Sequence, residues 1–396
     1  MNPFHRLWQL SLFSFILAAI TGFLYRYGML YPLPEIFHFA NIRHAHSHLM
    51  FFNWICPPLM ILMIQHLSKN GEIKYINSFK WCLSVMIFLG LLSYPFFLFY
   101  GYQSVAIGSA NLPLAAIISG LVMIAWYWFA WLYYKIEKRD SESVTHIIVD
   151  GALLTLLISS LGAWGVSIFQ FTPIDSPLIS SAMTHFFLSV FTEGWTVLGI
   201  LGMIWAKAGS VEFKPGAGWL WMPILFGSMM IFPFSLSQSL ITPAMLYTAY
   251  AGMILIIVSF SLNIYLLIKQ KVLNGFMWYT VFFLAGFILL FKFAAVLPVD
   301  IWPGEHGLRV LYLHVLLLGF FSVALIELFQ PKTARWIKAG FTISALLVIF
   351  SLFMISGYWP QALIPPNLFF WIMVVAGLPV IPAALLWFDT FKKSYK

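Results

Sequence analysis

Residues 244–268 read AMLYTAYAGMILIIVSFSLNIYLLI and contain no charged side chain. A helix must present about 20 mainly apolar residues to cross the hydrocarbon core of a bilayer, so this stretch predicts a membrane-spanning helix. Eleven other runs of the same character flank it along the chain. The twelve predicted spans lie near residues 8–30, 47–66, 77–100, 108–134, 147–170, 178–206, 217–236, 244–268, 274–296, 307–329, 336–357 and 367–390.

The composition of the whole chain agrees with this interpretation. Of its 396 residues, 62% are hydrophobic and 9% are charged, whereas a soluble domain is about half apolar and about a quarter charged. A chain this apolar cannot bury its surface in one water-soluble core, which excludes a soluble enzyme, a nucleic-acid-binding protein and a disordered protein. We therefore expect one all-α polytopic domain over residues 1–396, with the lipid bilayer as its surroundings.

The distribution of basic residues predicts the orientation of the spans. With the N-terminus inside and strict alternation, only four of the 21 Lys and Arg residues fall in the outer half. Those four are Arg26, Arg43, Lys292 and Arg309. Because cytoplasmic loops carry an excess of Lys and Arg, we predict that both termini are cytoplasmic and that the number of spans is even. The first run is too long for a signal peptide and is interpreted as a retained helix.

Six of the ten histidines fall on three of the predicted spans. They are His44, His46 and His48 at the start of span 2, His185 in span 6, and His306 and His314 in span 10. Spans 2, 6 and 10 all run from outside to inside, and each carries its histidines within about two turns of its outer end. Ionisable groups at membrane depth are costly and usually functional. The other four histidines, His5, His38, His66 and His146, are interpreted as interfacial or solvated.

This arrangement points to metal or heme ligation, because imidazole is a common ligand of transition metals and heme iron. In a regular helix His44 and His48 share a face, and His46 points roughly the opposite way. If the first turn is frayed, all three can line one side. The alternative is that the His-x-His-x-His run is an accident of a loop tip.

Two short stretches resemble a known family. They are RHAHSHLMFFNW at residues 43–54 and LHVLLLG at residues 313–319. Together with twelve helices and histidines on spans 2, 6 and 10, they resemble the heme-copper oxidase catalytic subunit, and more closely its smaller relative NnrS. The resemblance implies a pseudo-threefold bundle in a bacterial cytoplasmic membrane, a b-type heme, a copper ion, nitric oxide or another small diatomic as ligand, and a quinol or cytochrome as electron donor.

The resemblance also implies site residues. A low-spin heme would lie between span 2 and span 10, held by His44 or His48 and by His314, and His185 with the remaining span 2 histidines would hold a second metal. Two departures argue against a complete two-heme oxygen reductase. Leu316 replaces the second histidine of the family's His-x-His pair, and span 7, from Trp219 to Ser235, has no histidine for copper. Ser47 also stands where NnrS often has an acidic residue.

Three cations and one carboxylate complete the candidate site. Arg43, Arg309 and Lys292 suit heme propionates, because guanidinium groups bind carboxylates bidentately; the alternative is snorkelling to lipid headgroups. Glu193 lies eight residues beyond His185, on nearly the same helical face and about 12 Å deeper. An isolated carboxylate at that depth would take up a proton, so Glu193 is predicted as a proton donor. Its alternative role is a structural hydrogen bond to a neighbouring helix.

Two other classes of function stay open. Twelve spans with basic inner loops also fit a secondary transporter, although transporters place polar sites near the midplane on broken helices. The second class that stays open is a non-redox accessory protein that binds heme or copper. A repeat of two halves would favour the transporter, and a repeat of three four-helix parts would favour the oxidase-like fold.

Overall fold

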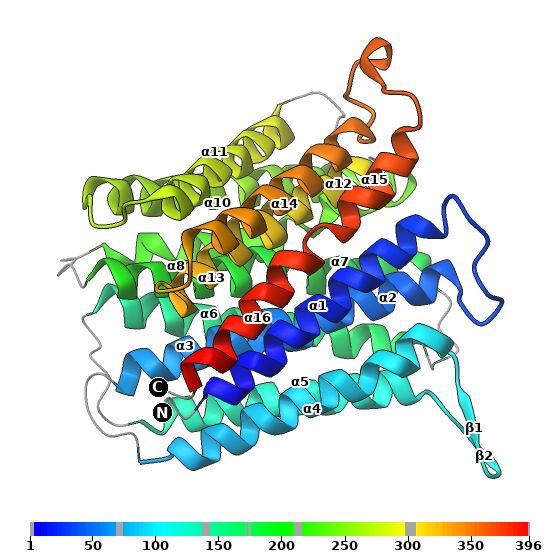
Figure 1. Ribbon diagram of the computed structural model, residues 1–396, viewed down its shortest axis with the longest axis horizontal. Coiled ribbons are helices and arrows are strands. Elements are labelled where there is room, and N and C mark those ends of the chain that lie inside the picture. Colours follow the sequence, from blue (N-terminus) through cyan, green and yellow to red (C-terminus); the bar gives the residue numbers. More distant parts are fainter. Residues whose placement is uncertain are drawn as a thin grey trace. The chain divides into compact units, whose positions relative to one another are not determined.

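The computed structural model describes residues 4–68, 74–136, 143–170, 172, 176–209, 216–297 and 306–394. Nearly all of them are helical, and a single two-stranded hairpin is the sheet structure of this described part (Figure 1). The chain divides into two compact units. The first comprises residues 1–137, 330–354 and 358–396, and the second comprises residues 138–329 and 355–357.

The first unit contains the helices of the four N-terminal and two C-terminal spans. Its elements are α1 (His5–Tyr27), α2 (Phe39–Leu49), η1 (Met50–Ile55), α3 (Cys56–Ser68), α4 (Ile76–Tyr100), β1 (Val105–Ile107), β2 (Ala110–Leu112), α5 (Leu114–Tyr134), α14 (Arg335–Met354), η7 (Gln361–Leu363), α15 (Leu368–Gly377) and α16 (Val380–Ser394). Helix α1 contacts α2, α15 and α16. Strands β1 and β2 pair antiparallel across a tight turn at Gly108, which has φ +62°.

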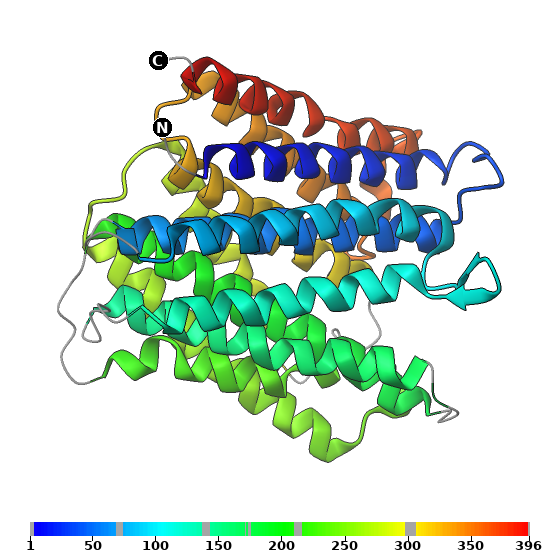
Figure 2. The same cartoon turned by 90° about the horizontal axis from the view of Figure 1, so that it is seen from below.

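Different segments of the chain lie at the two ends of the first unit. The ring Nε2 of His5 lies 3.1 Å from the carbonyl oxygen of Thr390, and the amide of Gln9 donates to the Thr390 hydroxyl at 3.0 Å. The start of α1 and the end of α16 therefore meet at one end of the helices. Figure 2 shows both chain termini at this end, with the loop after α1 and the β hairpin at the other.

The second unit contains the helices of the middle spans. Its elements are α6 (Val144–Gln170), α7 (Pro177–Ser189), η2 (Val190–Thr196), α8 (Val197–Ala208), η3 (Ala217–Leu220), α9 (Met222–Met230), η4 (Phe232–Ser235), η5 (Gln238–Leu240), α10 (Pro243–Lys269), α11 (Phe276–Val296), α12 (His306–His314), η6 (Val315–Phe321) and α13 (Ser322–Phe329). Helix α9 packs closely on α10, where a Cβ on Gly227 would lie 2.5 Å from the carbonyl oxygen of Gly252. Small residues at such crossings let membrane helices approach closely.

The protein is an all-α, multi-pass membrane protein. Eleven helices among the described residues are long and apolar enough to cross a membrane. Many of their large apolar side chains, such as Trp81, Phe88 and Leu290, are exposed. Exposed apolar side chains on this scale are accounted for by contact with lipid.

The predicted seventh span is not one helix. Residues 217–236 form the 3-10 turn η3, the nine-residue helix α9 and the 3-10 turn η4. Helix α9 ends at Met230, three residues before Pro233. Proline has no N–H to donate and disfavours helical backbone at the preceding residue, which explains the break.

Three spans differ from all the others in burial and in backbone. In the most apolar part of Phe39–Ser68, Pro177–Ala208 and Gly307–Phe329, 89%, 83% and 78% of the residues are buried, against 33–50% in the other eight candidates. Each of these three also contains a π-helical turn, η1, η2 and η6 respectively. They are the predicted spans 2, 6 and 10, so the feature recurs every fourth span.

Local side chains explain why these turns widen. In η1 the prolines Pro57 and Pro58 cannot donate hydrogen bonds, and the N–H of Cys56 bonds instead to the carbonyl of Phe51, five residues back. The hydroxyls of Thr196 and Ser322 likewise bond to carbonyls five residues back, at 2.9 and 2.6 Å. Single π turns inside helices occur frequently at functional sites.

Asn53 ties the π turn of span 2 to its neighbours, and this contact yields a stability prediction. Its amide donates to Ser14 of α1 at 3.1 Å and to the carbonyl of Ile87 of α4 at 3.0 Å. A Cβ on Gly90 would lie 1.7 Å from the Asn53 amide oxygen. We expect Gly90→Ala to destabilise the protein by about 1–3 kcal/mol through overpacking.

Gly286 provides the matched control for this substitution. It lies in α11 with no atom within 4 Å of a built Cβ, so Gly286→Ala is expected to stabilise the helix by about 0.5–1 kcal/mol. Thermal unfolding of the detergent-solubilised variants measures both effects. Equal unfolding temperatures for the two variants would contradict the packing of Asn53 against Gly90.

Candidate functional site

The histidines of span 2 lie on a regular α-helix, so the frayed arrangement predicted as an alternative is not observed. The rings of His44 and His48 have centroids 6.4 Å apart on one face of α2. His46 faces α1, where its ring Nδ1 lies 2.8 Å from the carbonyl oxygen of Ala18. Gly22 leaves room for this ring, because a Cβ there would lie 3.4 Å from two of its atoms.

His48 lies in an aromatic environment that the sequence did not reveal. Its ring stacks on Phe97 with centroids 3.8 Å apart and planes 10° apart. Its Nε2 is 2.7 Å from the hydroxyl of Tyr102, which comes from the segment between α4 and β1. Its Nδ1 is buried with no hydrogen-bond partner among the described residues. Burial raises the pKa of Tyr102 to about 12, so its hydroxyl stays neutral at physiological pH.

His314 of span 10 has the same hydrogen bond as His46. Its Nδ1 lies 2.7 Å from the carbonyl oxygen of Val310. A carbonyl oxygen only accepts, so Nδ1 carries the proton in both rings and Nε2 carries the lone pair. Metal-bound histidines almost always donate their second ring N–H in this way.

The second unit contains a cavity that is lined by four of the other predicted residues, His185, Glu193, Lys292 and Arg309. It has a volume of about 180 Å³ and is lined by His185 of α7, Glu193 of η2, Lys292 of α11, and Arg309 and Tyr312 of α12. Phe234 and Ser235 of the broken seventh segment close another side. His185 and Glu193 thus face one cavity, as their spacing predicted.

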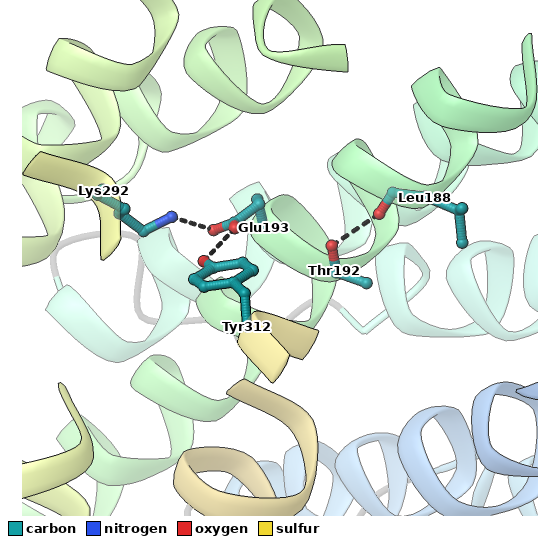
Figure 3. Close-up of polar contacts among 5 residues, drawn as sticks. All are labelled: Leu188, Thr192, Glu193, Lys292 and Tyr312. Carbon is teal, nitrogen blue, oxygen red and sulfur yellow. Dashed lines mark hydrogen bonds and ion pairs between the residues drawn. The ribbon is translucent and has the colours of Figure 1, made fainter. Parts of the chain in front are cut away.

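Glu193 forms the centre of a buried polar cluster in this cavity (Figure 3). The ammonium of Lys292 lies 2.6 Å from Glu193 Oε2, and the two side chains are 1% and 4% exposed. The hydroxyl of Tyr312 donates to Glu193 Oε1. Glu193 was predicted to be an isolated carboxylate, and this premise is wrong because Lys292 pairs with it. The pairing was missed because Lys292 lies 99 residues away in the sequence. Buried charges are tolerated when they are paired and hydrogen-bonded in this way.

The other predicted cations occupy different surroundings. Arg309 donates through Nη1 to the carbonyl of Ser235 at 2.9 Å. Arg43 is exposed on α2. His306 begins α12, and its side chain lies outside the described residues. The propionate role of Arg43, Arg309 and Lys292 stays a prediction, with Glu193 as the observed partner of the Lys292 ammonium.

Within the described ranges, no group of three or more His, Cys, Asp or Glu side chains is placed to hold a metal ion. The metal-ligand role of His44, His46, His48 and His185 stays a prediction. Tyr102 and Tyr312 are the polar residues that sequence reasoning missed. Neither carries a spacing signal, because each contacts its partner across a large sequence separation. Comparison with protein-family models and with curated proteins found no match to this chain.

Proposed function

We propose that this chain is a heme-binding redox protein of the cytoplasmic membrane, built like the heme-copper oxidase subunit and NnrS, which handles nitric oxide or another small diatomic. The observation that carries the proposal is that high burial, a π turn and a histidine close to that turn recur together in spans 2, 6 and 10. These three spans are the most buried, each has a π turn, and the turn begins two residues after His48, five after His185 and one after His314. A period of four spans fits three four-helix repeats and not two halves.

Twelve crossings with both termini cytoplasmic complete the proposed topology. The hydrogen bonds of Thr390 with His5 and Gln9 join α1 to α16, which supports an even number of crossings. The eleven candidate spans among the described residues, with the broken segment 217–235 counted as a twelfth, support that number. The positive-inside distribution of Lys and Arg supports a cytoplasmic position for both termini.

His46 and His314 are each proposed as a histidine that would hold heme iron. Both rings have Nδ1–H fixed on a backbone carbonyl, so their Nε2 atoms suit iron. This choice differs from the sequence expectation of His44 or His48, because Nε2 of His48 is hydrogen-bonded to Tyr102. The heme, of b-type, would supply electron transfer, and nitric oxide would bind it only in place of one of the two histidines. A quinol or cytochrome would supply electrons.

The cavity around Glu193 is the proposed route for protons. Its volume of about 180 Å³ is below the 300–1,000 Å³ typical of pockets for drug-sized ligands. It suits a few water molecules, each occupying about 30 Å³ in the liquid, or a diatomic gas. Glu193, held by Lys292 and Tyr312, would pass protons from this cavity.

The absorption spectrum of the purified chain tests the proposal. After expression with iron and heme precursor supplied, we expect a Soret band, reduction of the heme by dithionite, and a further spectral shift when nitric oxide is added. A preparation without a Soret band under these conditions would rule the proposal out. A Soret band that does not shift when nitric oxide is added would support heme binding and contradict the proposed handling of nitric oxide.

A secondary transporter is the second candidate, and one observation favours it. Transporters bind substrate on discontinuous helices near the midplane, and here the broken segment supplies Phe234 and Ser235 to the cavity that contains the Glu193–Lys292 pair. The test is proton-driven uptake of a solute by liposomes that contain heme-free protein. Uptake that is lost in Glu193→Gln would establish the transporter. Absence of uptake together with a Soret band would exclude it.

A further inference from the structure

The cavity of the second unit has a second polar feature besides the cluster around Glu193. Arg309 of α12 and His185 of α7 line the same cavity as Glu193 and Lys292. The proposed heme ligation and the proposed proton route use neither of these two side chains. Their presence on one cavity is therefore a separate feature that needs its own explanation.

The charges that line this cavity favour an anion. Lys292 and Glu193 neutralise each other at 2.6 Å, and the hydroxyl of Tyr312 occupies the other carboxylate oxygen (Figure 3). Arg309 adds a second cation, whereas Glu193 is the one acidic side chain among the described residues that line the cavity. The lining thus carries more positive than negative charge, and a concave site lined in this way attracts ions of the opposite sign.

Arg309 and His185 also supply suitable hydrogen-bond donors. Arg309 Nη1 donates to the carbonyl of Ser235 at 2.9 Å, which holds the guanidinium against η4. A guanidinium has five N–H donors in a rigid fork, so it can bind this carbonyl and an oxyanion at the same time. The ring of His185 makes no hydrogen bond with another described residue, and even a neutral imidazole can donate one.

The walls and the size of the cavity limit what can bind there. Phe234, Met253 and Phe291 form apolar parts of the lining, and such surroundings strengthen the attraction between opposite charges. The volume of about 180 Å³ holds a few water molecules of about 30 Å³ each. It therefore admits an anion of a few heavy atoms and excludes a sugar acid or a nucleotide.

We propose that this cavity binds one small, planar, monovalent oxyanion, of the size of formate, nitrite or nitrate, at Arg309, with His185 as the second donor. Two oxygens of a planar oxyanion accept parallel N–H bonds from one guanidinium. A divalent anion would bring a second negative charge that the lining does not balance, and an unbalanced charge in an apolar cavity is costly. The ion would take the place of part of the water in the cavity.

Binding of radiolabelled formate to the purified, detergent-solubilised full-length protein tests this site. We expect saturable binding of one formate per chain. Nitrite and nitrate should compete with it, whereas sulfate, which is divalent, and gluconate, which has the same carboxylate on a much larger body, should not. Because the site does not involve heme iron, heme-loaded and heme-free protein should bind formate equally, and formate should leave any Soret band unchanged.

Substitutions of Arg309 show whether this residue binds the ion. Arg309→Gln is expected to raise the dissociation constant of formate by about tenfold or more, since hydrogen bonds between charged groups are lost. Arg309→Lys keeps the charge without the fork, so we expect a smaller loss. Arg26→Gln is the matched control, because it removes an arginine from α1 of the first unit, and it should bind formate like the wild type. Thermal unfolding without formate checks that the variants are folded.

Several results would overturn the site. They are absence of saturable formate binding by the folded wild type, equal binding by the wild type and both Arg309 variants, and competition by gluconate as strong as that by nitrate. Formate binding found only in heme-free protein would assign Arg309 to a heme propionate and would also overturn the site for a free anion. Conversely, formate binding by a protein without a Soret band would support the anion site and contradict the proposed heme, so the two proposals can fail separately.

Discussion

Glu193→Leu is expected to destabilise the protein by about 3–5 kcal/mol, since it leaves the buried ammonium of Lys292 without its counter-charge. The two side chains are almost fully buried and lie 2.6 Å apart, so water cannot replace the lost partner. Tyr312 would lose its acceptor as well. Unfolding in mixed detergent micelles measures the effect. Lys292→Met is expected to produce a loss of similar size by exposing Glu193 to the same penalty.

The double variant Glu193→Leu with Lys292→Met is the decisive control. Replacing a buried ion pair by apolar residues of similar volume is often neutral or stabilising, so most of the stability should return. The return is expected to be incomplete by about 1–3 kcal/mol, because the hydrogen bond from the Tyr312 hydroxyl to Glu193 is still missing. Additive losses in the double variant would contradict direct pairing of Glu193 with Lys292.

His314→Ala and His46→Ala are each expected to lower the heme content of the purified protein by about tenfold or more, a loss that even outer-shell changes at metal sites can produce. Each variant removes an imidazole whose Nδ1–H is anchored on a backbone carbonyl. Pyridine hemochrome absorbance per mole of protein measures the loss. Added imidazole is expected to restore part of the spectrum, because it can occupy the space left by the side chain.

His38→Ala and His44→Ala are the controls for this experiment. His38 is exposed in the loop before α2, and His44 faces Tyr102 on the side of α2 away from His46. Both variants are expected to keep the wild-type heme content. Loss of heme in His44→Ala with retention in His46→Ala would restore the original expectation for span 2 and contradict the hydrogen-bond argument.

Much of the helical architecture could be predicted from the sequence, because apolar length alone identifies a membrane helix. Eleven of the twelve predicted runs correspond to long helices. The opposite directions of His46 and of the His44–His48 pair followed from helical periodicity, as did the shared cavity of His185 and Glu193. These features depend on local geometry, which the order of residues determines directly.

The features that sequence reasoning missed depend on contacts between distant segments or on backbone detail. Lys292 pairs with Glu193 across 99 residues, and Tyr102 meets His48 across 54. Helical periodicity in the sequence does not predict contacts between such distant residues. The π turns follow from prolines and hydroxyl groups whose effect on helical register is not visible in hydropathy. Residues 217–236 were expected to form one continuous span, and the helix instead ends before Pro233.

Low-temperature electron paramagnetic resonance of the oxidised, purified protein tests the central proposal most directly. Ligation of ferric heme by the imidazoles of His46 and His314 predicts a low-spin signal. In His314→Ala this signal should convert to a high-spin signal in whatever heme remains. Heme that is high-spin in the wild type, or a low-spin signal unchanged in both His46→Ala and His314→Ala, would contradict the account.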